Sequence, residues 1–541
     1  MAGTWKALNT QPSFNASTML LLTDGSVMVH QDATNQWHRW TPDPFDPMGD
    51  YANGRWTTLA TMPNLPPDTK SGTTNAPLYY ASAVLNDGRV FVAGGEDNGS
   101  IAVRGPGGAG NNAQLLSAQI YDPVVDAWTA ITTFPNGWTQ IGDAPCCVLQ
   151  DGRILLGNSS TTTGTQSTPT IYDPVAGTWI PTGAKNDLPA EETWTLLPNG
   201  TVLTVECTSP PNVERFGATG WTADAPTVIN GVAFTLPWPP PVGGNEIGPA
   251  ILLPGGSVFA IGGGATTLLY TPPPPPQLNV PPVTTGSWSL GPILQSAAGA
   301  ALFGADTPAC LLPNGLVLCC ATSVIIGTGA ANSVYFFEYN PATNTLTAAP
   351  APPNAGNTLF SSRMLLVPSG QVLFANGTQD IEIYTPAPGI VGSARPAIEA
   401  APSRVVPGFS YRLNGTGFNG VSQAVSFGDD ATSATNYPIV RLNHLASGHV
   451  RYGRTFDHST MGVATGETPV ETTVEIPWEM ESGAIQLIVI ANGIGSNVAE
   501  VEVVQVRSLR HWMVANGKTV TAPLLPQLPA SGVSLNALLP A

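Results

Sequence analysis

The chain repeats a short pattern of apolar runs separated by turn-forming residues. Its clearest copy, residues 83–95, has an apolar run, a turn at Asp87-Gly88, a second apolar run and two glycines. Asp-Gly or Asn-Gly between two apolar runs is the strongest short-range signal of a β-hairpin, because both turn residues must tolerate positive φ. Tyr-Asp-Pro at 121–123 and then Trp128 follow this hairpin. The pattern predicts a unit of four strands, the last of which carries a Trp.

The hairpin pattern recurs seven times in the first 390 residues. The turns are Asp24-Gly25, Asp87-Gly88, Asp151-Gly152, Asn199-Gly200, Gly255-Gly256, Asn314-Gly315 and Ser369-Gly370. The outer strands that follow them are marked by Trp56, Trp128, Trp179, Trp221, Trp288 and Leu346. Self-similarity at about 50 residues is typical of a kelch-type β-propeller, in which Trp and Tyr side chains pack between neighbouring blades.

The two ends of the repeat region complement each other. The seventh unit has no outer strand of its own, whereas residues 3–8 read as an outer strand without a unit. We therefore expect the N-terminus to complete blade seven and close the ring, which removes open sheet edges. The predicted fold is all-β: a seven-bladed propeller over residues 1–390, then an immunoglobulin-like β-sandwich over 395–508, where the repeat stops. Residues 509–541 are predicted to be a tail.

The composition agrees with this fold and limits the classes of molecule that the protein can bind. Charged residues make up 10% of the chain and hydrophobic residues 42%, with 58 Gly and 53 Pro, which suits many short strands. The net charge of -17 argues against nucleic acid and anionic membrane surfaces. No run approaches the roughly 18 apolar residues of a membrane span. Residues 1–5 do not read as a signal peptide, so we expect any leader to lie outside this chain, and we predict an extracellular or periplasmic protein.

The six cysteines match no zinc-binding spacing. If Asn314-Gly315 is a two-residue turn, Cys310 faces Cys319 across a hairpin. A cross-strand disulfide is then one alternative, and buried thiols within strands are the other.

Seven kelch-type units, an N-terminal closing strand and a C-terminal sandwich together resemble the galactose oxidase / glyoxal oxidase family. The resemblance covers nearly the whole chain and is also visible in residues 87–91 and 451–458. It implies a copper radical oxidase. The site of that family brings a Tyr cross-linked to a Cys, a second Tyr and two His ligands to the propeller axis.

Counting back from each hairpin Gly locates the positions that the resemblance implies. Tyr79 stands where the family has its Cys, Asp143 where it has the cross-linked Tyr, and Phe360-Ser361 where it has a Tyr-His pair. The final His, contributed by a hairpin of the C-terminal domain, matches His458, the metal-ligand candidate. One imidazole without a phenolate neither holds Cu(II) tightly nor supports a tyrosyl radical, so we expect copper to be absent.

The position nine residues before each hairpin Gly is expected to begin the innermost strand, near the mouth of the central channel. Blade by blade these positions are Ala16, Tyr79, Asp143, Glu191, Ile247, Asp306 and Ser361, with Glu192 and Glu246 adjacent. Four successive blades thus place carboxylates at or beside the axis. Carboxylates this close repel each other unless a cation, a proton or a hydrogen-bond donor lies between them.

Three interpretations of this acidic channel remain open. In the first, a C-terminal hairpin plugs the ring and neutralises the acids with Arg451, Arg454 and His458. In the second, a hard cation such as Ca²⁺ binds the carboxylate oxygens; its ligands would be Asp143, Glu191, Glu246 and Asp306. In the third, the acids serve a polar small molecule as acid and base, with Tyr79, Tyr80 and Trp194 as walls.

The function that the sequence favours is non-catalytic. A rigid ring of loops with few charges suits binding or assembly, with a glycan, a protein or a second copy of the chain as partner. The alternative is a diverged galactose/glyoxal oxidase-like oxidoreductase, or another small-molecule enzyme that uses the acidic channel. The sequence contains no Gly-x-Ser-x-Gly, His-Glu-x-x-His or phosphate-loop motif.

Overall fold

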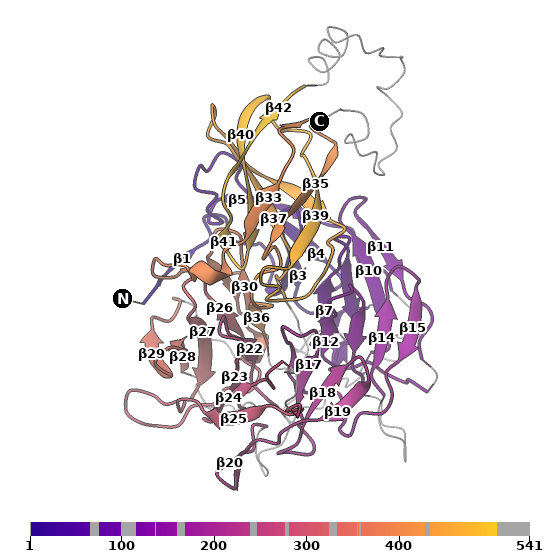
Figure 1. Cartoon of the computed structure of the whole chain (residues 1–541), viewed down its shortest axis with the longest axis vertical. Helices are drawn as coiled ribbons and strands as arrows, with labels where there is room; N and C mark the ends of the chain where they lie inside the picture. The colour runs from indigo at the N-terminus through magenta and orange to yellow at the C-terminus, as the bar shows by residue number, and fades with distance from the viewer. Residues whose placement is uncertain are drawn as a thin grey trace.

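The computed structural model gives the arrangement of most of the chain (Figure 1). The described residues are 2–64, 75–98, 115–135, 137–159, 168–237, 246–275, 281–323, 333–353, 355, 359–427 and 433–505. The predicted tail at 509–541 lies outside them. Within the described ranges, no helix is long and apolar enough to cross a membrane.

Antiparallel sheets of four strands form the first three blades. Blade one contains β2 (Ala16–Leu21), β3 (Val27–Gln31), β4 (Trp37–Pro42) and β5 (Gly54–Thr58). Blade two contains β7 (Ala81–Val84), β8 (Val90–Ala93), β10 (Ala118–Asp122) and β11 (Ala127–Ala130). Blade three contains β12 (Cys146–Val148), β13 (Ile154–Leu156), β14 (Thr170–Asp173) and β15 (Thr178–Pro181). Beside blade two, β6 (Pro77–Leu78) pairs with β9 (Asp97–Asn98).

The next three blades repeat this meander. Blade four contains β16 (Trp194–Leu196), β17 (Val202–Val205), β18 (Val213–Gly217) and β19 (Gly220–Ala223). Blade five contains β22 (Ala250–Leu252), β23 (Val258–Ile261), β24 (Thr267–Thr271) and β25 (Ser287–Leu290). Blade six contains β26 (Ala309–Leu311), β27 (Val317–Thr322), β28 (Val334–Asn340) and β29 (Thr345–Ala349). A small ribbon, β20 (Val228–Ile229) paired with β21 (Val232–Ala233), lies between blades four and five in the sequence.

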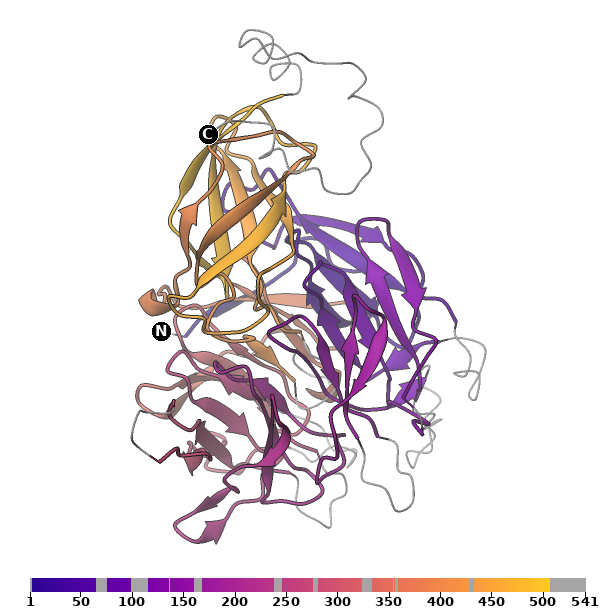
Figure 2. The ribbon, with the colours of Figure 1, turned by 45° about the vertical axis from the view of Figure 1, so that its right-hand side comes forward.

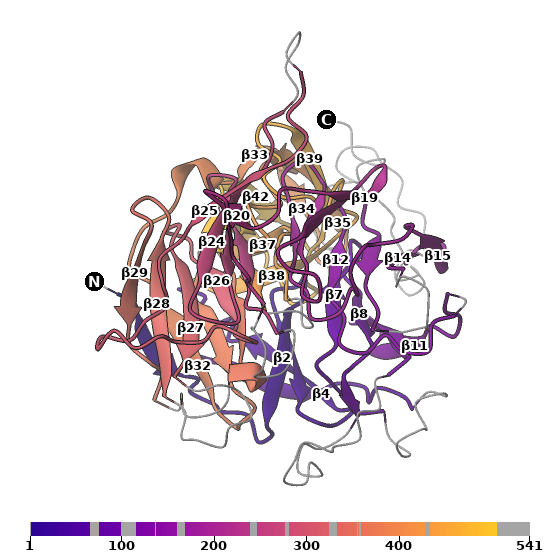
Figure 3. The same cartoon turned by 90° about the horizontal axis from the view of Figure 1, so that it is seen from below.

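Blade seven is completed by the N-terminus, as the sequence predicts. Its strands are β30 (Arg363–Leu366), β31 (Val372–Ala375), β32 (Ile381–Thr385) and β1 (Thr4–Ala7). Trp5 lies opposite Tyr384 in the β1–β32 ladder. The innermost strands then adjoin in the order β2, β7, β12, β16, β22, β26 and β30, and β30 adjoins β2. The seven blades therefore close into a propeller, which Figure 3 shows from below.

The hairpin turns of the blades differ from the two-residue turn expected. In each turn, the Gly amide donates to the carbonyl of the residue three positions earlier. The amide of that earlier residue donates to the carbonyl of the residue that follows the Gly. Leu85, Gly88 and Arg89 illustrate the pattern. Gly88 has φ +85°, but neither Asn86 nor Asp87 has positive φ. The turns are thus type I turns closed by a glycine bulge, in which a single position requires the left-handed conformation.

Aromatic side chains join neighbouring blades as the repeat predicts. The ring of Trp128 lies 5.1 Å from that of Tyr121, and its Nε1 donates to the carbonyl of Ala60 in blade one at 2.9 Å. Trp56, Trp179, Trp288 and Trp5 make equivalent bonds to the carbonyls of Thr10, Thr133, Ala225 and Pro350, whereas Nε1 of Trp221 donates to Oγ1 of Thr182. The six outer strands that carry a Trp are therefore tied to the preceding part of the ring, and β29 of blade six carries Leu346 in place of the Trp.

A second domain follows the propeller and packs against one of its faces (Figures 1 and 2). Its sheet runs in the order β33 (Ala397–Ala400), β35 (Ser410–Thr416), β39 (Pro469–Glu475), β38 (Val450–Phe456), β37 (Ile439–His444), β40 (Gly483–Ala491), β42 (Ala499–Val503) and β34 (Arg404–Val405), with β41 (Ile494–Gly495) on β40. Strand β38 is shared: residues 450–453 pair with β37 and residues 454–456 with β39. The sheet bends there around its own core, which includes Tyr411, Leu442 and Leu487. Its immunoglobulin-like character stays a prediction.

The cysteine register differs from the expectation by one residue. Cys319 lies opposite Ala309, and Cys310 lies opposite Leu318. Alternate residues of a strand point to opposite faces, so the two sulfur atoms face away from each other. No disulfide joins any of the six cysteines, and all six are buried.

Candidate functional site

The residues counted back from the hairpin Gly lie where the sequence places them. Ala16 begins β2, and the six others stand two or three residues before the innermost strand of their blade. The second domain contacts the opposite ends of these strands: the amides of Thr455, Asp457 and Met461 donate to carbonyls in or beside the turns of blades one to three. The acidic positions therefore lie toward the propeller face that is remote from the second domain.

Three of these positions share an unusual backbone. Tyr79, Glu191 and Asp306 have φ values of +53°, +58° and +49°. Left-handed backbone at a non-glycine residue costs on the order of 1–3 kcal/mol and persists only where the surroundings impose it. The ring of Tyr79 also meets that of Phe360 at 6.0 Å and 72°, although blade one separates their blades in the ring. Side chains from blades two and seven thus converge beside the axis.

The axis is filled from the second-domain side by residues 422–427, which we call the axial segment. Its strand β36 (Val425–Ser426) extends blade six by pairing with β26. The Leu311 amide donates to the carbonyl of Ala424 at 2.7 Å. In blade four, the Leu196 amide donates to Oε1 of Gln423 at 3.0 Å. In blade five, the Ala250 amide donates to Oγ of Ser426 at 3.3 Å. Three successive blades therefore hydrogen-bond to one short segment.

The end of the axial segment lies in blade seven. The guanidinium of Arg363 stacks on the ring of Phe427 at 3.8 Å and donates to the carbonyls of Phe360 and Ser362. A cavity of about 20 Å³ remains between the segment and blades three to five. That volume accommodates roughly one water molecule. Along the length of this segment the channel is packed protein.

The residues predicted to plug the channel lie elsewhere. Arg454 pairs with Glu475 on the neighbouring strand β39 at 2.7 Å and stacks on Phe456. Arg451, on the same strand, lines a groove at the domain boundary. The prediction that these arginines neutralise the axial acids is wrong, because β38 belongs to the sheet of the second domain, where Arg454 pairs with Glu475 and Arg451 lines the groove. The axis is plugged by the axial segment instead.

His458 is buried in the second domain. It is 4% exposed, and its Nδ1 is hydrogen-bonded to Oγ1 of Thr472 at 2.8 Å. Burial lowers its pKa to about 3, so the imidazole is neutral. Its carbonyl accepts a bond from Nδ2 of Asn86 in a blade-two turn. His458 therefore helps to dock the domains, and its ring is not an axial ligand.

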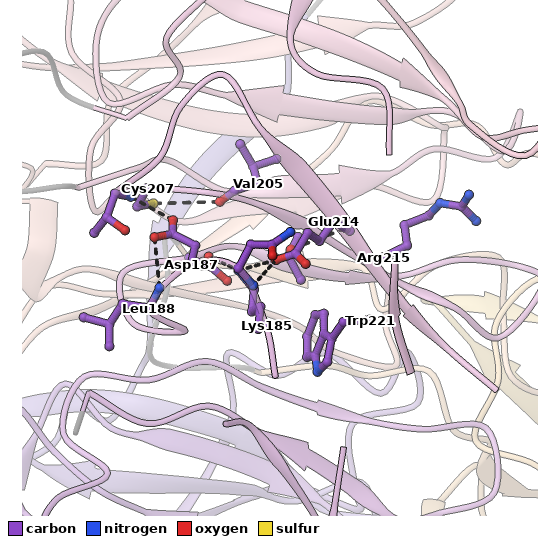
Figure 4. A network of polar contacts seen from close by, with 12 residues as sticks. Lys185, Asp187, Leu188, Val205, Cys207, Glu214, Arg215 and Trp221 are labelled. Atoms are coloured by element: carbon purple, nitrogen blue, oxygen red, sulfur yellow. Dashed lines mark hydrogen bonds and ion pairs between the residues drawn. The ribbon is translucent and has the colours of Figure 1, made fainter. Parts of the chain in front are cut away.

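A buried polar network surrounds Lys185 and Glu214 in blade four (Figure 4), and Glu192 and Trp194 belong to it. Oε1 of Glu192 is 2.6 Å from Nζ of Lys185, and Nε1 of Trp194 donates to Oε2 at 3.0 Å. Lys185 also lies 3.3 Å from Glu214, and its side chain is 0% exposed. Both oxygens of Glu192 thus have partners inside the blade, so its predicted role as a channel ligand is wrong. Trp194 lines the small axial cavity.

This network contains more acids than bases. Glu206 is 1% exposed, and burial together with the nearby charge of Glu214 raises its pKa to about 8. Burial likewise raises the pKa of Glu192 to about 7, although Lys185 opposes the shift. Sequence reasoning missed Lys185. The available signal was that one of only four lysines precedes the acidic pair at 191–192.

The donor set does not fit the copper centre that the resemblance implies. Its positions are occupied by Tyr79, Asp143, Phe360 and Ser361, and the one matching imidazole, His458, is bonded inside the second domain. Among the described residues, no group of three or more His, Cys, Asp or Glu side chains is arranged to hold a metal ion. The calcium alternative, which needs Glu246 together with the three axial acids, therefore gains no support.

Comparisons with known proteins find a similar fold among solved structures. No family model matches the chain, and no curated protein matches its sequence. Among solved structures, it is similar to one described as a novel fungal alcohol oxidase with catalytic diversity among the AA5 family, in complex with copper. The two chains are 13% identical over 93% of this chain and 99% of that chain, with a TM-score of 0.48.

Proposed function

We propose that this protein is a binding or assembly protein and that its propeller axis is structural. The observation that carries this proposal is the axial segment. Gln423, Ala424 and Ser426 accept hydrogen bonds from the innermost strands of blades four, six and five. A catalytic channel has to admit a substrate, whereas the cavity between this segment and blades three to five holds about one water.

The surroundings of the axis support the same proposal. Closure by β1 and the bonds from the outer-strand Trp side chains make the ring a rigid platform for loops and grooves. The net charge of -17 excludes polyanions from most of the surface. A glycan, a protein or a second copy of the chain remain the proposed partners, and an extracellular or periplasmic location remains the proposed setting.

An oxidase assay tests this proposal. The purified protein is loaded with Cu(II), its bound metal is measured, and peroxide release is followed on primary alcohols and aldehydes. We expect substoichiometric copper and no turnover above that of buffer with Cu(II). Stoichiometric copper with turnover would overturn the proposal.

A second candidate function is an enzyme at the acidic mouth of the axis, including a diverged oxidoreductase. The observation that favours it is the left-handed backbone of Tyr79, Glu191 and Asp306 at one repeat position, because such strain gathers at functional sites. If turnover were found, loss of activity in Asp143→Asn and Glu191→Gln would assign it to this mouth. Glu467→Gln, an exposed acid of the second domain, is the matched control.

A further inference from the structure

We propose that the groove between blade one and the second domain binds a carboxylate-bearing oligosaccharide. The groove has a volume of about 610 Å³, which is the size of a small-molecule or short-oligomer site. Blade one contributes strands β4 and β5 and the segment after β4, and the second domain contributes β38 and the end of β39. This inference names a ligand class and a site for the binding function proposed above, and in that respect it rests on it.

Positive charge is concentrated in this groove. Four of the chain's 19 Lys and Arg residues line it: Arg39, Arg55, Arg451 and Arg454. The acids that share the lining are Asp24, Glu475 and Glu479. In a chain with a net charge of -17, arginines at this density form a local exception to the overall field. Guanidinium groups bind planar carboxylates through pairs of parallel hydrogen bonds.

Several of these donors are not used by the protein. Nε and Nη2 of Arg39 and Nε of Arg451 are enclosed by the protein and have no hydrogen-bond partner among the described residues, so no carboxylate of that part of the chain neutralises these atoms directly. Arg39 approaches Asp24 only to 3.8 Å, which is too far for a hydrogen bond. Arg55 is exposed on β5 and has no ion pair in the described part of the chain. Arg454, which is paired with Glu475, is the exception. Arginine charges that the chain's own carboxylates compensate incompletely, those of Arg39 and Arg55 above all, favour an anionic ligand in the groove.

Part of the remaining lining is apolar and exposed. Phe45 is 64% exposed and Val124 is 51% exposed, and the half-buried Pro44 and Pro477 extend the same surface. The Phe45 ring is positioned by His449, whose ring lies 4.6 Å away at 86°. Flat apolar surface beside charged donors suits a sugar ring, which presents C–H groups on its faces and carboxylates at its edge. A simple inorganic anion would leave this surface unused.

The groove is held open by contacts between its two sides. The Val450 amide of the second domain donates to the carbonyl of Pro44 in blade one at 2.8 Å. Tyr452 packs so closely on Gly25 that a Cβ there would lie 2.5 Å from the ring. A preformed site avoids the cost of ordering on binding.

Calorimetry with short oligogalacturonates tests the inference on the full chain. The matched ligand is the same oligomer with its carboxylates methyl-esterified, and sulfate and acetate are the small-anion controls. We expect the acidic oligomer to bind, with affinity that falls as salt rises. The ester, sulfate and acetate should bind at least ten-fold more weakly. Equal binding of acid and ester, or of oligomer and acetate, would overturn the proposal.

Variants locate the binding. Arg55→Gln and Arg451→Gln should each weaken binding of the oligogalacturonate by about ten-fold, because each removes one charged donor. Arg412→Gln is the matched control, since Arg412 is an exposed arginine outside the groove, paired with Glu471. Unchanged affinity in both groove variants would place the ligand elsewhere and overturn the inference. The peroxide assay is separate: turnover with intact groove binding would remove the proposed function and leave the groove assignment standing.

Discussion

The side-chain oxygen of Gln423 accepts a hydrogen bond from the backbone amide of Leu196 at 3.0 Å, which joins the second domain to the innermost strand of blade four. Nε2 of the same side chain lies 3.8 Å from Sγ of Cys147 in blade three. Leu196 and Cys147 are both fully buried. One amide group therefore serves two blades at the axis, where each innermost strand exposes an edge that no further blade strand covers.

Replacing Gln423 with Ala should destabilise the protein by about 1–3 kcal/mol, because the Leu196 amide would lose its acceptor while buried. The expected result is a lower urea midpoint without loss of the folded baseline. Gln486→Ala is the control, since Gln486 lies on β40 and its side chain makes no hydrogen bond in the described part of the chain. Equal stability of the two variants would contradict a structural role for the axial segment.

The regularity of the blades could be predicted from the sequence because it is local. Each unit carries its own turn glycine, and the first five also carry a pair of outer aromatic residues, such as Tyr121 and Trp128. The closing strand could be inferred because residues 3–8 read as an outer strand with a Trp but belong to no unit. The positions at the axis followed from the same count.

The contents of the axis could not be predicted, because they depend on contacts distant in sequence. Strand β36 has two residues and no periodicity, and it pairs with Cys310 across more than a hundred residues. The place of Arg454 in a hairpin predicts a position at the axis, but its partner is Glu475 on the adjacent strand. Lys185 contacts both Glu192, in the loop before β16, and Glu214 on β18, which no sequence spacing reveals.

Removing the buried cation of blade four should be strongly destabilising. Lys185→Met would leave Glu192 and Glu214 buried without their positive partner, and breaking a buried pair in this way costs about 3–5 kcal/mol. Thermal unfolding at neutral pH is the measurement. The double variant Lys185→Met with Glu192→Gln should recover part of the loss, because it removes one buried charge. No recovery would show that packing, not charge, explains the single variant.

Glu206 should make the protein less stable as pH rises. Its pKa is about 8 in the folded chain, against 4.5 for an ordinary Glu. Between these values the folded state holds a proton that the unfolded state has lost. Stability from Glu206 is therefore complete below about pH 4.5 and declines toward pH 8, by at most about 1.4 kcal/mol per pH unit.

Urea unfolding between pH 5 and pH 9, a range chosen to span roughly the pKa of Glu206, tests this prediction. Glu206→Gln should gain stability relative to the parent as pH rises. Glu500→Gln, on β42 of the second domain, is the control and should show a constant difference. A constant difference for Glu206→Gln as well would mean that its carboxyl group is ionised in the folded protein.

His458 should act in the opposite direction at lower pH. Burial lowers its folded pKa to about 3, against 6.5 in an exposed His. Below about pH 6.5 the unfolded chain binds a proton that the folded chain does not, so stability falls as pH decreases toward 3. In His458→Gln this contribution should vanish, and its stability should depend less on pH between about 4 and 7 than that of the parent. An identical pH dependence in parent and variant would contradict the buried neutral imidazole.

Ring closure should depend on Trp5. Its ring lies 4.9 Å from that of Tyr384 and 5.3 Å from that of Phe336, and its Nε1 donates to the carbonyl of Pro350 at 2.6 Å. Because Trp5 is half-buried, Trp5→Ala should cost about 2–4 kcal/mol, somewhat below the range for a fully buried Trp. The comparison is Trp478→Ala, since Trp478 is 69% exposed and the cost of its removal should stay within about 0.5 kcal/mol.

The measurement is the unfolding midpoint together with proteolysis of β1. Cleavage within residues 2–8 should accelerate only in Trp5→Ala, because the N-terminal strand would detach before the other blades unfold. If both variants lost stability equally, or if β1 stayed protected, the closing strand would not be held by its aromatic contacts.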